Sequence, residues 1–290
     1  MSANDGTPPC TMSDTPRAAA KPGAPPIVQF NNVTKSYSRG TKRAFTAVKD
    51  VSFTVEDVVG HGEFVAVLGP SGCGKSTILR LIAGLAPQFP ATSGDVLYHG
   101  KPITGPGADR GMVFQDYASY DNRTVLDNVA FGLECRGMAK AERYALALEW
   151  IAKVGLNPTK DAYKYPHQLS GGMRQRVAIA RTLILKPRII LMDEPFGALD
   201  PTTRHNMQDL LVQLWREVEA TVFFVTHDVH ESVYLGDRIY IFSNSPGTIL
   251  HQFYVTPPDR PARQMMREPS FQDTVFAIRE ILEALEEGKD

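Results

Sequence analysis

Residues 63–77 place an apolar run, a glycine-rich loop and a helical pattern in direct succession. The run "EFVAVLG" is short and continuously apolar, which is typical of a strand buried on both faces of a sheet. The loop "GPSGCGKST" (69–77) fits the pattern G-x-x-x-x-G-K-[ST], and "KSTILRLIAGL" continues from it as a helix. This order of strand, tight loop and helix predicts an α/β protein with a phosphate-binding loop, rather than a glycine-rich turn that binds nothing.

The residue types of this loop suit a phosphate group. Its glycines permit a tight turn whose backbone N–H groups converge on an anion, and the dipole of the following helix adds positive charge. Lys75 would reach the terminal phosphates of a nucleotide, the Ser76 hydroxyl would bind Mg²⁺, and Thr77 would add a phosphate contact. Cys73 is expected to contribute its backbone and not its thiol. The predicted nucleotide-binding set of the loop is Gly69, Pro70, Ser71, Gly72, Cys73, Gly74, Lys75, Ser76 and Thr77.

Segments with strand and helix patterns alternate along the rest of the chain. This alternation predicts a mostly parallel sheet with helices on both faces. The stretch from about 116 to 187 has mainly helical patterns, so we expect a helical insertion there. The predicted strands are 27–33, 44–55, 63–69, 111–115, 188–193, 221–226 and 238–243, and the predicted helices are 75–85, 124–137, 141–155, 171–186, 202–219, 228–235 and 271–288.

Composition excludes several classes of protein. The 290 residues, 43% of them hydrophobic, are enough for one large domain or two modest ones. A net charge of −1, from 31 basic and 32 acidic residues, argues against nucleic-acid binding through a basic surface. The three cysteines have no metal-ligand spacing, which favours free thiols in a reducing cytosol. No apolar run approaches the roughly 20 residues that span a bilayer, and no secretory signal is recognisable.

Composition also suggests the domain limits. Residues 1–26 are rich in Pro, Ala, Ser, Thr and Asp, and they are expected to be a disordered tail. Residues 27–255 carry the alternating pattern and form the predicted catalytic domain. Residues 256–290 are expected to be a surface linker and a C-terminal helix whose apolar face packs on the domain, with a partner-binding helix as the alternative.

Polar side chains follow several of the predicted strands at their carboxyl ends, where open parallel sheets bind their ligands. Asp193 and Glu194 end the run "RIILMDE". Asp193 would hold Mg²⁺, and Glu194 is the natural general base or water-positioning residue. Gln115 is expected beside the metal, and His227 near the terminal phosphate, so these two and Glu194 form the predicted catalytic set. Tyr37 closes the first strand region and could stack on an adenine base.

A second loop-to-helix junction occurs at "LSGGMRQR" (169–176). Ser170, Gly171 and Gly172 would stand at a helix N-terminus, which is a second anion site built from backbone donors and a hydroxyl. The chain already has a complete phosphate loop at 69–77, and the helical insertion branches away from the sheet. The two sites are therefore not expected to serve one nucleotide within one chain.

The order of Tyr37, "GPSGCGKST", Gln115, "LSGGMRQR", "IILMDEP", "GALD" and His227 resembles the nucleotide-binding subunit of an ATP-binding cassette (ABC) transporter, over residues 27 to about 245. The resemblance implies a P-loop NTPase fold with a mostly parallel sheet, an N-terminal antiparallel β subdomain and a helical insertion. It also implies that two subunits pack head to tail, so that residues 170–172 of one chain close over the ATP held by the other. Asp200, in "GALD", would contact the partner across this seam. Met173 stands where many members have glutamine, and activity is expected to survive this departure.

The resemblance further implies ATP and Mg²⁺ as ligands, and ATP hydrolysis coupled to transport across a membrane. The expected partners are a second copy or a homologous ATPase subunit, an integral membrane permease and, indirectly, a periplasmic or extracellular solute-binding protein, with no nucleic acid. The expected location is peripheral, on the cytoplasmic face of the inner membrane. The phrases at 105–115, 124–134, 197–204 and 243–249 resemble the nitrate, sulfonate and taurine importer branch, whereas 116–123 departs from the Leu-Pro-Trp text common there.

Three alternatives remain open on the sequence alone. A soluble ABC ATPase of DNA repair or translation would usually have a long coiled-coil insertion or two cassettes, and this chain shows one cassette with a short insertion. A small-molecule kinase built on the same phosphate loop would lack "LSGG". A subunit of an exporter can share the present layout, so neither the direction of transport nor the solute is fixed.

Overall fold

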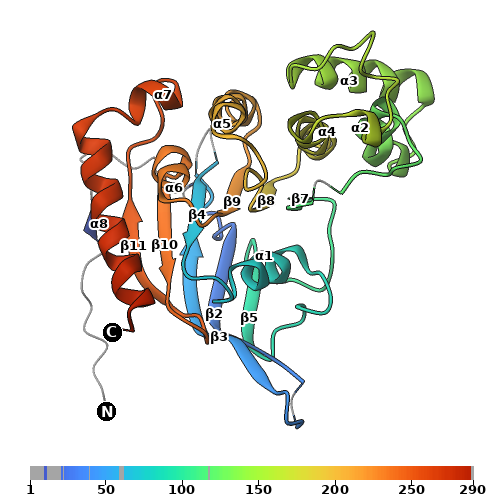
Figure 1. Cartoon of the computed structure of the whole chain (residues 1–290). Coiled ribbons are helices and arrows are strands. Elements are labelled where there is room, and N and C mark those ends of the chain that lie inside the picture. Colours follow the sequence, from blue (N-terminus) through green and yellow to red (C-terminus); the bar gives the residue numbers. More distant parts are fainter. Residues whose placement is uncertain are drawn as a thin grey trace.

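The computed structural model describes residues 10–11, 21, 23–38, 40–58, 62–116 and 118–288 (Figure 1). Its larger sheet has seven strands in the order β1-β11-β10-β4-β9-β8-β7. The neighbours from β10 to β7 pair in parallel, and β11 is antiparallel to β10. The predicted mostly parallel sheet is therefore confirmed. Its strands are β1 (Cys10–Thr11), β4 (Phe64–Leu68), β7 (Arg110–Val113), β8 (Ile189–Asp193), β9 (Thr221–Val225), β10 (Arg238–Phe242) and β11 (Ile249–Tyr254).

A second, antiparallel sheet is formed by the N-terminal part of the chain. It has four strands in the order β3-β2-β5-β6. The N-terminal antiparallel β subdomain is thus confirmed, although β2 continues past the predicted end at residue 33 to Tyr37. The strands are β2 (Val28–Tyr37), β3 (Phe45–Val55), β5 (Ser93–Tyr98) and β6 (Lys101–Pro102).

The helices follow the predicted order, with changes at their ends. The helix predicted over 202–219 stops at Trp215, because the chain turns back there and the Trp215 indole donates a hydrogen bond to the Ala220 carbonyl at 2.8 Å. A short helix lies in the stretch expected to be a linker. The helices are α1 (Lys75–Ala83), α2 (Val125–Cys135), α3 (Lys140–Lys153), α4 (Gly171–Leu183), α5 (Pro201–Trp215), α6 (Val229–Leu235), α7 (Ala262–Met265) and α8 (Pro269–Glu286), with a 3₁₀ turn at Pro166–Gln168.

The strands of the larger sheet are buried on both faces, and alternate side chains enter two separate cores. In β4, Val65 and Val67 point into a core shared with α1 and the antiparallel sheet. Phe64, Ala66 and Leu68 point into the core that is covered by α5, α6, α8 and the insertion. Figure 1 shows α2, α3 and α4 grouped together beyond the β7–β8 edge of the sheet. The continuous apolar runs in the sequence arise from this two-sided burial.

The C-terminal helix α8 packs on the domain, as expected. Its Phe271, Val275, Ile278 and Leu285 are buried in the same core as α6. The Leu285 carbonyl also accepts a hydrogen bond from the Asn244 side chain at 2.7 Å, which ties the last turn of α8 to the segment after β10.

The predicted tail lies largely outside the described residues, so its disorder stays a prediction there. Within it, β1 pairs in parallel with the end of β11, and Lys21 forms an ion pair with Asp57 at 2.8 Å. Among the helices that the structure describes, none is both long and apolar enough to cross a membrane.

Candidate active site

The glycine-rich loop joins β4 to α1 in a conformation that requires glycine. Gly72 and Gly74 have φ angles of +79° and +99°. A Cβ atom at Gly74 would lie 2.4 Å from Val48 Cγ1 and 2.8 Å from the Ala47 carbonyl oxygen. Strand β3 therefore packs so closely against the loop that position 74 has no room for a side chain. The N-terminus of α1 has no side-chain cap, which leaves its amides available to an anion.

Lys75 begins α1, and its side chain turns back over the loop. The ammonium group donates hydrogen bonds to the Gly69 carbonyl at 2.7 Å and to the Pro70 carbonyl at 2.8 Å. These two contacts hold a positive charge beside the backbone amides of the loop, although Lys75 is only 6% exposed. Cys73 is also buried, and burial raises the pKa of its thiol. Its thiol therefore faces the core, in agreement with a backbone role.

Ser76 and Asp193 meet at the carboxyl end of β8. The Ser76 hydroxyl donates a hydrogen bond of 2.8 Å to Asp193 Oδ1. Burial raises the pKa of the Asp193 carboxyl, whereas the Ser76 hydrogen bond and the positive charge of Arg80 lower it. Hydroxyl and carboxylate oxygens are ligands that Mg²⁺ prefers, and it usually takes only one or two protein ligands beside a phosphate. The donor set therefore fits Mg²⁺.

The three predicted catalytic residues meet at Glu194, which directly follows Asp193. Gln115 Nε2 donates a hydrogen bond of 3.3 Å to Glu194 Oε2. His227 Nδ1 lies 3.5 Å from the same oxygen. The Glu194 side chain keeps 27% of its surface exposed, so a water molecule can reach it. Gln115 thus contacts Glu194, the predicted base, whereas a position beside the metal was expected as well.

The two strands before Gln115 and His227 end earlier than predicted. β7 ends at Val113, and Gln115 lies in the turn that follows. β9 ends at Val225, so His227 also stands two residues beyond its strand. The expectation that Gln115 ends a strand is therefore wrong, and His227 lies one residue further beyond its strand than expected. Their position on loops lets both side chains bend back toward Glu194.

Tyr37 lies at the end of β2, close to the phosphate loop. Its hydroxyl is 3.5 Å from the Thr77 hydroxyl. One face of its ring stacks on Phe45, with 5.0 Å between centroids and 19° between planes. Phe45 is 55% exposed, and the sequence patterns did not single it out. Phe45 could have been found as the aromatic residue at the start of β3, where it lies directly opposite Tyr37 in the antiparallel pair.

The junction at 169–176 forms a helix N-terminus, as predicted. Ser170 caps α4, and its hydroxyl accepts a hydrogen bond from the Met173 amide at 3.3 Å. A Cβ atom at Gly171 would meet nothing within 4 Å, whereas one at Gly172 would lie 3.0 Å from Thr203 Cγ2 on α5. The Met173 side chain packs against the larger core. The departure at position 173 thus serves packing, and the glycine backbone beside it stays accessible.

Asp200 caps α5 by accepting hydrogen bonds from the Thr202 and Thr203 amides, both at 3.1 Å. A hydrogen bond from the Thr203 side chain, followed by those from the two amides, lowers the pKa of its carboxyl. Asp200 is exposed, and its contact with a second copy stays a prediction. The structure thus groups Ser76, Asp193, Glu194, Gln115 and His227 around the phosphate loop, while residues 170–172 begin a helix of the insertion.

Comparisons with known proteins agree with this geometry. A sequence profile described as "ABC transporter" matches residues 48–197. The nitrate import ATP-binding protein NrtD of Synechocystis is 44% identical over 239 residues, which are 80% of this chain and 86% of that protein. The taurine import ATP-binding protein TauB of Escherichia coli is 46% identical over 206 residues, 71% of this chain and 77% of that protein.

A solved structure gives the same result for the fold. The dimeric, post-hydrolysis state of the ATP-binding cassette MJ0796, bound to ADP and Pi, matches with a TM-score of 0.68 and 35% identity, over 79% of this chain and 99% of that chain. The family profile covers more than half of this chain, and the relatives match it over more than two thirds of its length. The chain therefore belongs to the ABC transporter family and is an ATP-binding, ATP-hydrolysing member of it.

Proposed function

We propose that this chain is the nucleotide-binding subunit that powers an importer of nitrate, a sulfonate, taurine or a related small solute. The observation that carries the proposal is the convergence of Gln115, Glu194 and His227 beside the Ser76–Asp193 pair. The importer branch is supported by relatives named for nitrate import and for taurine import.

The residues around the loop have separable roles in ATP hydrolysis. The loop amides and Lys75 would hold the phosphates, and the ordering of Lys75 by two carbonyls keeps its charge in place. Glu194 would orient the attacking water and accept its proton, because its side chain is partly exposed and is itself oriented by Gln115 and His227. Mg²⁺, held by Ser76 and Asp193, would neutralise phosphate charge when bound.

The proposal includes a head-to-tail dimer. In it, Ser170, Gly171 and Gly172 of one protomer approach the nucleotide on its partner, and Asp200 contacts the partner across the seam. Support comes from the open space at Gly171 and from the dimeric state of the solved relative. ATP shifts the equilibrium toward the closed dimer to the extent that it binds this state better, and hydrolysis reverses the shift.

Work on a solute requires a membrane partner. We infer a peripheral position on the cytoplasmic face of the inner membrane, against an integral permease that receives its solute from a periplasmic or extracellular binding protein. Gln115 and residues 116–123 would pass the motion to the permease. Tyr120 supports this role, because the residue remains 41% exposed although its ring contacts Phe131 and the Arg181 guanidinium.

The proposal is tested by affinity purification of the tagged full chain from detergent-solubilised membranes of its host, followed by mass spectrometry. A multi-span permease in roughly equal amount is the expected result. Its genomic neighbours would then supply a binding protein to test with nitrate, taurine and sulfonates. Recovery of soluble repair or ribosomal factors, without a membrane protein, would replace transport with the non-transport alternative.

A further inference from the structure

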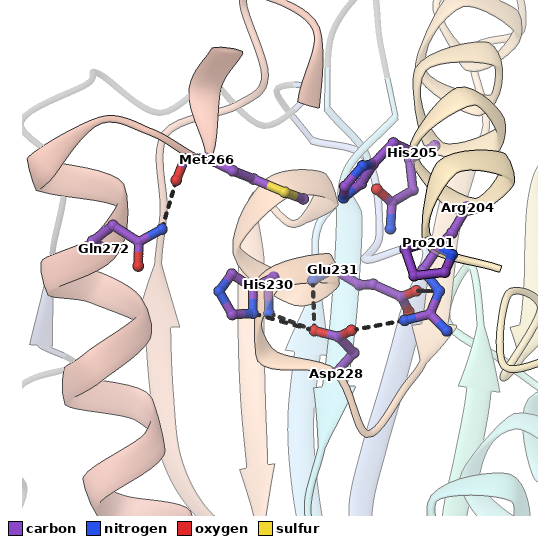
Figure 2. A pocket seen from close by; sticks show the side chains of 9 residues that line it. Pro201, Arg204, His205, Asp228, His230, Glu231, Met266 and Gln272 are labelled. Carbon is purple, nitrogen blue, oxygen red and sulfur yellow. Dashed lines mark hydrogen bonds and ion pairs between the residues drawn. The ribbon is translucent and has the colours of Figure 1, made fainter. Parts of the chain in front are cut away.

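Arg204, in the first turn of α5, connects two loops of the site that are distant in the sequence. Its guanidinium donates a hydrogen bond from Nη2 to the Leu199 carbonyl at 3.2 Å, inside the segment 197–200. Nη1 donates to Asp228 Oδ2 at 3.2 Å, and Nε lies 3.6 Å from Glu231 Oε1. Figure 2 shows the guanidinium directly beside both carboxylates, in a cavity that α5 and α6 help to line.

The far end of this connection holds the loop that carries His227. Asp228 caps α6 by accepting a hydrogen bond from the His230 amide at 2.8 Å. The Asp228 amide donates to the Thr226 hydroxyl at 3.0 Å, and that hydroxyl donates to Glu231 Oε2 at 2.7 Å. His227 therefore lies between Thr226, whose hydroxyl is bonded to Glu231, and Asp228, whose carboxylate is bonded to Arg204.

We propose that Arg204 is a positioning residue for ATP hydrolysis, which fixes the His227 loop relative to the segment 197–200. A displacement of that segment by the partner protomer would then move His227 relative to Glu194. This inference rests on the proposed function, because it requires segment 197–200 to contact a second copy. It goes beyond that function by naming the side chain that links segment 197–200 to the His227 loop of the same protomer.

An arginine is suited to this position by its shape. Its planar fork bonds a carbonyl and a carboxylate at once while its Nε faces a second carboxylate, which one lysine ammonium cannot reproduce. Glu231 is only 5% exposed in its side chain. Its oxygens accept a hydrogen bond from the Thr226 hydroxyl at 2.7 Å and face Arg204 Nε at 3.6 Å. Thr226 and Gln208 are neutral, so Arg204 is the charged group among those that lower the pKa of this carboxyl.

Glu231 gives the connection a pH-dependent component. Burial raises its pKa to about 7, against smaller opposing effects of the Thr226 hydroxyl and Arg204. The charged and titratable groups facing it are Arg204 on α5 and Asp228 at the start of α6, and His205 and His230 line the same cavity of about 310 Å³. Above about pH 7, Arg204 thus faces two carboxylates, and below it only that of Asp228.

The test measures ATP turnover and nucleotide affinity of the full chain for Arg204→Gln and Arg204→Lys. Turnover in Arg204→Gln should fall about 10-fold or more, as expected for a displaced catalytic group, while ATP affinity changes less than about 2-fold. Arg204→Lys should recover part of the loss. Arg260→Gln is the matched control, because Arg260 also faces two carboxylates, Asp259 and Glu268, but lies at the surface, and it should leave turnover unchanged.

Two further substitutions, Asp228→Asn and Glu231→Gln, separate positioning from folding. Asp228→Asn keeps a good helix cap, and the double variant with Arg204→Gln should turn over no more slowly than the slower single variant. Wild-type turnover should also rise from pH 6 to pH 8 more steeply than that of Glu231→Gln. All other titratable groups are the same in both proteins, so only the difference between the two profiles reports on Glu231.

The outcomes distinguish the two proposals. If the wild-type chain hydrolyses ATP and Arg204→Gln hydrolyses it at the same rate, the role of Arg204 is overturned and the proposed function stands. A loss of nucleotide affinity and thermal stability in proportion to the loss of turnover would overturn this role as well, because that result describes a structural arginine. A wild-type chain that hydrolyses ATP no faster than Glu194→Gln would overturn the proposed function, and the role of Arg204 with it.

Discussion

Gly74→Ala is the change in the phosphate loop whose cost follows most directly from the structure. Gly74 has a φ of +99°, where an L-residue costs roughly 1–2 kcal/mol. The added Cβ would lie 2.4 Å from Val48 Cγ1 and 2.8 Å from the Ala47 carbonyl oxygen. Because the second contact is with backbone, β3 or the loop must shift, and overpacking of this kind costs about 1–3 kcal/mol. The expected loss in the free energy of unfolding is therefore about 2–5 kcal/mol.

Gly72→Ala is the matched control for this estimate. Gly72 has a φ of +79°, but a Cβ atom there would meet nothing within 4 Å. It should lose only the conformational part, about 1–2 kcal/mol. Urea unfolding of both variants at 25 °C measures the difference, and titration with a fluorescent ATP analogue shows whether the loop still binds phosphate. Equal destabilisation of the two variants would refute the close packing of β3 against the loop.

Three further changes test other parts of the site. Glu194→Gln should still bind ATP but hydrolyse it about 10²–10⁴-fold more slowly in a phosphate-release assay, and turnover at the parent rate would exclude Glu194 as the base. Phe45→Ala should weaken ATP binding by about 0.5–1.5 kcal/mol in a calorimetric titration if the exposed Phe45–Tyr37 stack receives the adenine ring, and unchanged affinity would place the base elsewhere. Burial raises the pKa of Glu231 from 4.5 to about 7, so its contribution to stability is fully present below about pH 4.5 and is lost as the pH rises to about 7. Glu231→Gln should flatten that decline by about 3 kcal/mol in unfolding experiments across this range, whereas an unchanged pH profile would mean that the carboxyl is not buried in solution.

The sequence predicted the central strands because they are buried on both faces and leave continuous apolar runs. β11 reads "ILHQFY", and only Phe253 of its six residues is buried. β5 begins with three exposed residues. Neither has an apolar run or a regular alternation, so their pairing with neighbours could be recognised only in the folded chain.

The site was predictable where its residues belong to local patterns. The loop glycines follow β4, Asp193 ends β8 and Glu194 comes directly after it, and the carboxyl ends of parallel strands meet at one edge. The link from Arg204 to Asp228 has no such local signal, because the two residues are 24 positions apart and lie on different helical segments. Phe45 was missed because an aromatic residue in a strand is usually a core residue, and its exposure is a property of the fold.

The backbone of Glu194 connects the stability of the fold with its chemistry. Glu194 has a φ of +44°, a left-handed conformation that suits glycine or asparagine and costs a glutamate roughly 1–2 kcal/mol. Its amide bonds the Val225 carbonyl at 3.0 Å, so the turn away from β8 starts while the chain is still tied to β9. This turn brings the carboxylate toward Gln115 and His227. Strained residues of this kind concentrate at functional sites, and exposed polar contacts of 3.3 and 3.5 Å contribute little to stability. The strain at Glu194 therefore supports the catalytic role proposed for it.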